Sequence, residues 1–144
     1  MTTPDLPTAG PIGPSPDGVD EPYWDALANG ELRLPRCRSC GRHVWTPQWM
    51  CPRCHHTEFD WPTVSAAGTV YSWTRAWHPF HPDLADAVPY VVVLVELDEA
   101  PDVRLLGILV ENGVKVRIGA RVTGVIQPAS HRTSGLAVLR WELT

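Results

Sequence analysis

The sequence predicts a mainly β protein, in which a short N-terminal helix and a four-cysteine ribbon precede a small barrel of five strands. Three observations support this prediction. The four cysteines form two Cys-x-x-Cys pairs, the second half of the chain consists of short β-rich runs, and its helical patterns do not exceed one or two turns. The predicted division is a tail over residues 1–20, the helix and ribbon over residues 21–62, and the barrel over residues 63–144.

The first 20 residues are predicted to be a disordered tail. They contain five prolines and three glycines but almost no large apolar side chains, so they cannot bury enough surface to offset the entropy lost on ordering. A short helix is expected to follow. Asp20 is its expected N-cap, Pro22 lies in its first turn and Gly30 closes its C-terminus.

The barrel strands are predicted from runs of alternating or β-branched residues. Residues 68–74 alternate with a period of two, and Pro89–Asp98 contains an unbroken apolar run rich in valine, which is typical of a strand buried on both faces. Asn112-Gly113 has the chemistry of a tight turn. Five short strands in succession indicate a closed or partly open barrel. The other three are expected over residues 102–110, 121–128 and 135–143.

Composition and charge argue against several classes of protein. The net charge is −4 and the pI is about 5.8, which argues against a main task of neutralising nucleic-acid phosphates. The longest apolar runs are far shorter than the ~18 residues that cross a bilayer, and the N-terminus has no secretory pattern. We therefore expect a cytoplasmic protein that spans no membrane.

The cysteines carry the strongest chemical signal. Cys37 and Cys40 form one pair and Cys51 and Cys54 the other, and ten residues separate the pairs. Two such pairs place four thiolates where two turns converge, which suits a tetrahedral zinc ion. Iron in a rubredoxin-like site uses the same ligands, so it remains an alternative. Two disulfides would need an oxidising compartment, and a redox pair is normally single.

No catalytic residue is predicted. Four protein ligands leave a metal no open position, so the expected zinc is structural, and no cysteine remains as a free nucleophile. The sequence has no nucleophile elbow with a histidine and an acid, and no glycine-rich phosphate loop before a helix. His55 and His56 follow the last cysteine and are expected in a solvated loop.

Several stretches occur in the order found in one protein family. Together with the cysteine pairs, they make residues 21–144 resemble the acyl-CoA-associated family that joins a rubredoxin-like zinc ribbon to an OB-fold, long catalogued as a domain of unknown function. The resemblance implies that the predicted barrel is an OB-fold. The stretches are Gly30–Cys37, Gly68–Thr74, Pro89-Tyr90, Val95–Leu97 and Ile118-Gly119.

The resemblance also implies a role. Members of this family are small partners of thiolase-superfamily enzymes, including acyltransferases and retro-aldolases of steroid side-chain breakdown. Trp24-Asp25 and His78-Pro79 look most similar to the steroid-aldolase partners. One departure is that residues 45–49 lack the arginine of a Pro-Pro-Arg-like segment often found in the family.

Six residues are candidate contacts for a partner or for acyl-CoA. Tryptophan and arginine are enriched at interface hot spots, and a small ribbon with a barrel cannot easily bury so many indoles. The alternative is that the tryptophans seal the ribbon against the barrel. The candidates are Arg42, Trp45, Trp49, Trp73, Trp77 and His78.

The expected function is that of a non-catalytic accessory subunit of a thiolase-like acyl-CoA enzyme, such as a retro-aldolase acting on a steroid-derived acyl-CoA. Partner residues would carry out the chemistry. One alternative is a ribbon and OB protein that binds single-stranded nucleic acid by stacking, although the negative charge of tail and barrel argues against it. Another is a freestanding acyl-CoA-binding module.

Overall fold

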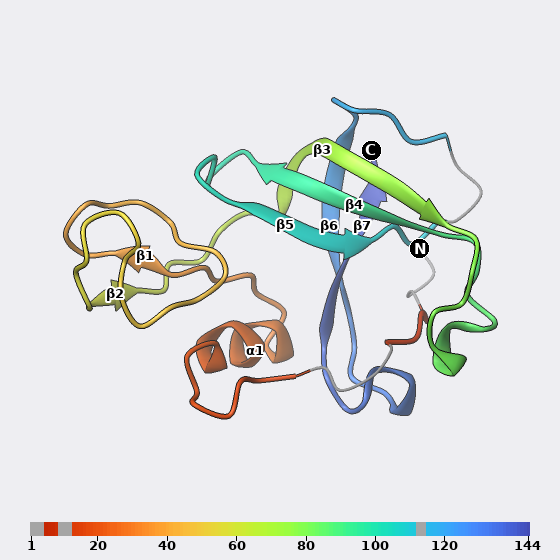
Figure 1. Ribbon diagram of the computed structural model, residues 1–144, viewed down its shortest axis with the longest axis horizontal. Helices are drawn as coiled ribbons and strands as arrows, with labels where there is room; N and C mark the ends of the chain where they lie inside the picture. The colour runs from red at the N-terminus through yellow and green to blue at the C-terminus, as the bar shows by residue number, and fades with distance from the viewer. Residues whose placement is uncertain (1–4, 9–12, 112–114) are drawn as a thin grey trace.

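The computed structural model describes residues 5–8, 13–111 and 115–144. The described chain forms an α-helix, two short 3-10 helices, a two-stranded sheet and a five-stranded sheet (Figure 1). The predicted mainly β architecture is confirmed. The elements are α1 (Glu21–Ala28), β1 (Arg36–Cys37), β2 (Phe59–Asp60), β3 (Ala67–Ala76), η1 (Pro82–Leu84), β4 (Tyr90–Leu97), β5 (Arg104–Ile108), β6 (Arg121–Gln127), η2 (His131–Thr133) and β7 (Val138–Leu143).

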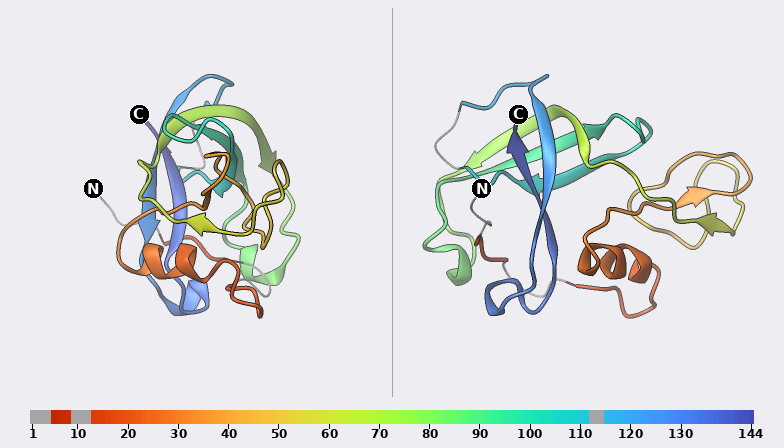
Figure 2. Two further views of the ribbon diagram at one scale, coloured as in Figure 1. Left: turned by 90° about the vertical axis from the view of Figure 1, so that its left-hand side faces the viewer. Right: turned by 180° about the vertical axis from the view of Figure 1, so that it is seen from behind.

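The five-stranded sheet is antiparallel in the order β5-β4-β3-β6-β7 and curls into a half-barrel (Figure 2). β3 pairs with β4 along nearly its whole length but with β6 only over its first three residues. A bulge between Val70 and Ser72 bends β3, as extra residues in a strand do. A parallel bridge between Leu109 and Trp141 brings the two edges of the sheet together.

The main core lies inside this half-barrel. Val91, Val93 and Val95 of β4 point inward and are 0% exposed. The prediction that this strand is buried on both faces is wrong for its outer face, where Val92 and Leu94 are only half-buried. An antiparallel sheet can leave one face in water, so β-branched composition alone does not show which face is covered.

Helix α1 lies between the ribbon and the barrel (Figure 1). Pro22 occupies its first turn and Gly30, with a φ of 80°, follows its end, as the sequence predicts. Asp20 holds the N-cap position but makes no capping hydrogen bond. Its carboxylate instead accepts from the Ser15 N–H at 2.7 Å and from the Trp24 indole N–H at 3.2 Å. None of the described helices is long and apolar enough to cross a bilayer.

The ribbon forms a lobe beside the barrel, where β1 and β2 pair antiparallel (Figure 1). It has a small core of its own, which contains Cys37, Val44 and Cys51. The linker before β1 belongs to the other core, because Leu32 and Leu34 are buried with the barrel valines. The ribbon is therefore connected to the barrel by a packed linker.

Part of the segment predicted as a disordered tail differs from that expectation. Residues 5–8 lie against the barrel, where buried polar side chains of β6 and β7 bind their main chain. Composition does not show such bonds. Residues 1–4 and 9–12 lie outside the described residues, as does the predicted turn at Asn112-Gly113.

Candidate metal centre and contact surfaces

The four cysteine side chains converge in the ribbon lobe. Their sulfur atoms all lie within 4.8 Å of one another, with 3.4 Å between Cys37 and Cys54 and 3.7 Å between Cys40 and Cys51. Four sulfurs bound to zinc at about 2.3 Å lie about 3.8 Å apart in a regular tetrahedron. The donor set and its spacing fit a structural zinc ion held by all four residues.

The same backbone turn closes each Cys-x-x-Cys pair. The Gly41 N–H donates to the Cys37 carbonyl at 3.0 Å, and the His55 N–H donates to the Cys51 carbonyl at 2.9 Å. Both donors have positive φ angles, 76° at Gly41 and 64° at His55. Glycine adopts this conformation freely, whereas a residue with a Cβ is destabilised in it by about 1–2 kcal/mol. His55 is therefore held in a strained position by the turn, while its side chain is exposed.

Main-chain donors also tune the thiols. The N–H of Cys40 is the largest cause that lowers the pKa of Cys37, and the N–H of Cys54 does the same for Cys51. At Cys40 the N–H of Arg42 lowers the pKa, but desolvation and the neighbouring thiols outweigh it and raise the pKa to about 11. A dication at the centre would favour the thiolate form of all four residues.

Two of the six candidate contact residues, Arg42 and Trp45, join the ribbon to the rest of the chain. Arg42 Nη2 lies 3.1 Å from Asp102 Oδ1, in the loop between β4 and β5. The Trp45 ring lies 4.9 Å from the Tyr23 ring of α1, and Trp45 packs on the barrel core. These contacts favour the interpretation that Trp45 seals the ribbon against the barrel.

Trp49 lies between the cysteine pairs and is 61% exposed. Its indole N–H donates to Asp17 Oδ2 at 2.9 Å. Hydrogen bonds from Ser15 and Trp49 are the two largest causes that lower the pKa of the Asp17 carboxyl. The segment before α1 therefore contacts the ribbon loop.

The other three candidates are Trp73 in β3 and, beyond its end, Trp77 and His78; β3 ends on the side of the molecule away from the ribbon (Figure 1). Trp77 is 72% exposed and Phe80 is 78% exposed. The His78 ring lies 5.1 Å from the Phe80 ring in an edge arrangement. The six candidates thus belong to separate surfaces and do not form one site.

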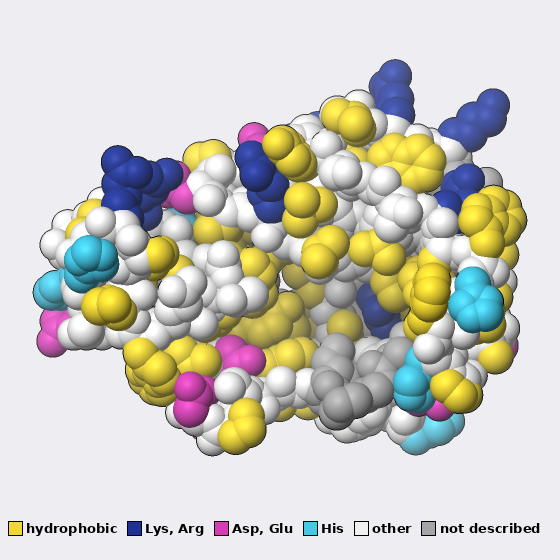
Figure 3. Space-filling view, in the orientation of Figure 1, with side chains coloured by type: hydrophobic (Ala, Val, Ile, Leu, Met, Phe, Trp, Pro, Cys, Tyr) yellow, Lys and Arg dark blue, Asp and Glu magenta, His cyan; other side chains and the backbone are white. Residues whose placement is uncertain are grey.

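Sequence reasoning missed a further exposed surface on the outer side of β3, β4 and β5. Tyr71 and Leu106 are exposed here, and the Arg104 guanidinium lies 3.7 Å from the centre of the Tyr71 ring. Thr74, Leu94 and Leu106 line a groove of about 190 Å³ on this face. Figure 3 shows apolar side chains gathered over the barrel. The alternation of residues along a strand shows that the strand has two faces, but it does not show which face the rest of the protein leaves exposed.

Comparison with known sequences identifies both parts of the chain. The ChsH2 rubredoxin-like zinc ribbon domain matches residues 24–60, and the ChsH2 C-terminal OB-fold domain matches residues 61–127. The barrel is therefore an OB-fold, as the family resemblance implies.

Individual proteins match as well. A Thermomonospora curvata protein named "Probable enoyl-CoA hydratase alpha subunit" is 42% identical over 108 residues, which cover 72% of this chain but only 32% of the relative. A chain of the Ltp2-ChsH2(DUF35) aldolase is 29% identical and superposes with a TM-score of 0.76 over 91% of this chain and 98% of that one. A DUF35 protein of unknown function from Sulfolobus solfataricus, 20% identical, shares the fold with a TM-score of 0.60 over 91% of this chain and 87% of its own. The chain belongs to the ChsH2 family, in which a rubredoxin-like zinc ribbon precedes an OB-fold domain.

Proposed function

We propose that this chain is a non-catalytic accessory subunit of an aldolase complex and that its partner is a thiolase-like acyl-CoA enzyme. The observation that carries the proposal is the match to a chain of the Ltp2-ChsH2(DUF35) aldolase, which extends over 91% of this chain and 98% of that one. A superposition of this extent includes both the ribbon and the barrel. The surfaces of this chain that we consider for partner docking therefore belong to the part that superposes on the aldolase chain.

The partner would carry out the cleavage of a carbon–carbon bond next to the thioester. In this chain, the metal centre offers four cysteine ligands, and four-coordinate zinc of this kind has no open position for water or substrate. The role left to this chain is to complete the interface and to order partner residues around the acyl-CoA. The substrate class proposed is a steroid-derived acyl-CoA, because Trp24-Asp25 and His78-Pro79 resemble the steroid-aldolase partners.

The surface proposed for the partner is the outer side of β3–β5 together with the loop after β3. Trp77 and Phe80 expose most of their rings, and Tyr71 and Leu106 extend the apolar area along the sheet. Apolar area of this kind marks interaction sites, and aromatic anchors carry a large share of binding energy. Arg104 lies over Tyr71 and is paired with Glu96 at 3.6 Å, so this surface also carries an ion pair.

Co-expression with a thiolase-like protein from the same host tests the proposal. The two chains should co-purify in a fixed ratio, and only the complex should cleave an acyl-CoA with a steroid-derived side chain. Cleavage by this chain alone would contradict the accessory role. Salt-dependent binding to a single-stranded oligonucleotide, without complex formation, would support the nucleic-acid alternative instead.

A further inference from the structure

The first half of β7 is buried on both faces, although β7 is an edge strand of the sheet. Val138, Leu139, Arg140 and Trp141 are all buried in succession. Alternate residues of a strand face opposite sides, so Leu139 and Trp141 face the core while Val138 and Arg140 face away from it. Something other than the barrel core must therefore cover the outer face.

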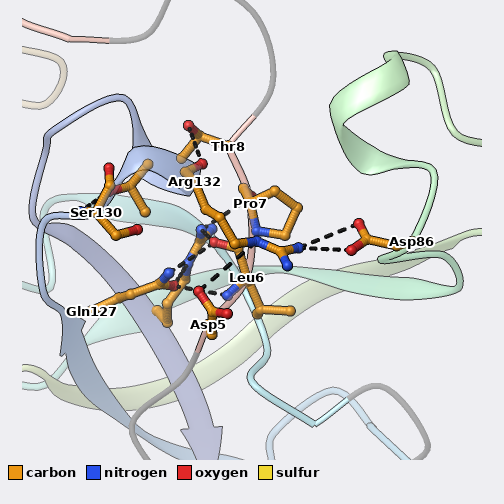
Figure 4. A network of polar contacts seen from close by, with 10 residues as sticks. Asp5, Leu6, Pro7, Thr8, Asp86, Gln127, Ser130 and Arg132 are labelled. Carbon is orange, nitrogen blue, oxygen red and sulfur yellow. Dashed lines mark hydrogen bonds and ion pairs between the residues drawn. The ribbon is translucent and has the colours of Figure 1, made fainter.

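The cover is the N-terminal segment of residues 5–8, as Figure 4 shows. Pro7 and Thr8 are buried. The Thr8 N–H donates to the Arg132 carbonyl at 3.0 Å. Arg132, in turn, is bound by Asp86 at 3.0 Å and lies 3.9 Å from Asp5. Residues 5–8 thus lie between three parts of the barrel: strand β7, the 3-10 helix η2 that precedes β7, and the loop that contains η1.

Two buried polar side chains bind the main chain of this segment. Gln127, the last residue of β6, is 1% exposed, and Arg140 is 3% exposed. The Gln127 amide donates to the Leu6 carbonyl at 2.8 Å and accepts from the Leu6 N–H at 3.4 Å. Arg140 Nη2 donates to the carbonyls of Leu6 and Pro7 at 2.9 and 3.2 Å, and its Nε donates to Gln127 Oε1 at 2.9 Å.

Each of the main-chain hydrogen-bonding groups considered in residues 6–8 has a partner in the barrel or needs none. Leu6 and Thr8 each have a bonded N–H, and Pro7, which lies between them, has no N–H to satisfy. The carbonyls of Leu6 and Pro7 accept from Gln127 or Arg140. Since the contacts from Gln127 and Arg140 are to main-chain atoms, they do not depend on the side chain at position 6.

A packing role does not explain why a guanidinium is buried at this position. Within the described residues, the hydrogen bonds of Arg140 go to neutral oxygens and none goes to a carboxylate. Burial lowers its pKa to about 10. Well-packed apolar residues can often replace a buried ion pair without loss of stability, whereas a buried charge that loses its acceptors is costly. A buried arginine that binds only carbonyl and amide oxygens fits a site for a peptide main chain.

We propose that Gln127 and Arg140 form a binding site for the main chain of an extended, proline-containing segment, and that residues 5–8 of this chain are its resident ligand. The segment that follows is anchored a second time, because Asp17 accepts from the Trp49 indole of the ribbon loop. Residues 5–8 therefore contact the barrel, and Asp17 contacts the ribbon. Nothing in this proposal depends on the aldolase partner.

Amide hydrogen exchange of the full-length chain tests the site directly. The Thr8 amide should exchange at least ~10-fold more slowly than the same amide in a synthetic peptide of residues 1–12, because hydrogen-bonded amides exchange only on opening. Arg140→Met should bring its rate to within about twofold of the peptide. Leu6→Ala is the matched control: it keeps every main-chain group, so protection should stay near wild type.

Pro7→Gly is a second variant that changes no residue of the barrel. The glycine introduces an N–H without a partner in the bound segment and increases the conformational entropy of the segment when it is not bound. Both effects should reduce the protection of the Thr8 amide. The exchange rates of the β4 amides should not change, which shows that the barrel remains folded. A Thr8 amide that exchanges at the peptide rate in the wild type would overturn the proposal. So would protection that neither Arg140→Met nor Pro7→Gly reduces.

Discussion

The Trp141 indole lies directly against Gly107. A Cβ on Gly107 would lie 2.5 Å from Trp141 Cδ1 and 2.6 Å from Nε1. Trp141 is fully buried and pairs with Leu109 in the bridge that brings the sheet edges together. The absence of a side chain at position 107 therefore allows this large ring to fill the closing seam of the half-barrel.

Gly107→Ala should destabilise the protein, since the buried ring has no free space into which to move. Overpacking of this kind typically costs about 1–3 kcal/mol. For a chain of this length, about 2 kcal/mol lowers the melting temperature by roughly 5–10 °C. Leu106→Ala, at the exposed neighbouring position, is the control and should leave the melting temperature nearly unchanged. Equal effects of the two changes would contradict this account of the seam.

One zinc ion per chain is expected on Cys37, Cys40, Cys51 and Cys54. Structural zinc in such sites contributes roughly 10–16 kcal/mol of apparent binding free energy. Cys51→Ser should therefore remove the metal and unfold the ribbon, while the barrel, which has a separate core, stays folded. Metal analysis with hydrogen exchange checks both parts, with Met50→Ala as the exposed control. Full metal content in the serine variant would show that the assigned ligand is wrong.

The strained turn at His55 gives a paired test of the ribbon. His55→Gly relieves a positive φ and should raise the affinity for zinc, whereas Gly41→Ala creates the same strain in the other knuckle and should lower it. A strain of about 1–2 kcal/mol corresponds to roughly 5–30-fold in either direction. Competition with a chelator measures both. A change of the same sign in both variants would exclude strain as the cause.

The ribbon could be predicted from the sequence because its ligands are close together in the chain. The spacing of two Cys-x-x-Cys pairs is enough to indicate the metal centre and the turns around it. Residues 5–8 are the opposite case. Leu6 and Arg140 are 134 residues apart, and nothing in the composition of either segment shows that they meet. The signal in the sequence is that Arg140 stands between the apolar residues Leu139 and Trp141 in the last predicted strand. The sequence does not show which groups bind this arginine.

The candidate contact residues show a second limit. Trp45 and Trp77 are both tryptophans in stretches without clear periodicity, so the sequence could not separate them. Only the tertiary contact between Trp45 and Tyr23 distinguishes a packed indole from an exposed one.

An ion pair between the end of β4 and the start of β6 predicts a dependence on pH. Arg121 binds Asp98 through both guanidinium nitrogens, at 2.8 and 2.5 Å, and this hydrogen bonding lowers the pKa of the Asp98 carboxyl. A lowered pKa means that the pair stabilises the fold at neutral pH and that this contribution is lost as the pH falls through the lowered value. Asp98→Asn should therefore melt slightly below wild type at pH 7, and the difference should shrink as the pH falls below the ordinary aspartate pKa of about 3.9. A difference that persists unchanged at low pH would show that the charge is not responsible.

The two interpretations of the tryptophans are separated by the same substitution at two positions. Trp45→Ala removes a ring packed between α1 and the barrel core, so it should lower the melting temperature clearly, by the amount expected for about 2–3 kcal/mol. Trp77→Ala removes an exposed ring, so the melting temperature should stay near wild type. If the loop after β3 contacts the thiolase-like partner, Trp77→Ala should weaken the complex by about 2 kcal/mol, which is roughly 30-fold in affinity. Melting temperature and partner affinity are measured on both variants. Unchanged affinity in Trp77→Ala, with weakened binding per folded molecule in Trp45→Ala, would move the partner surface from the end of β3 to the ribbon.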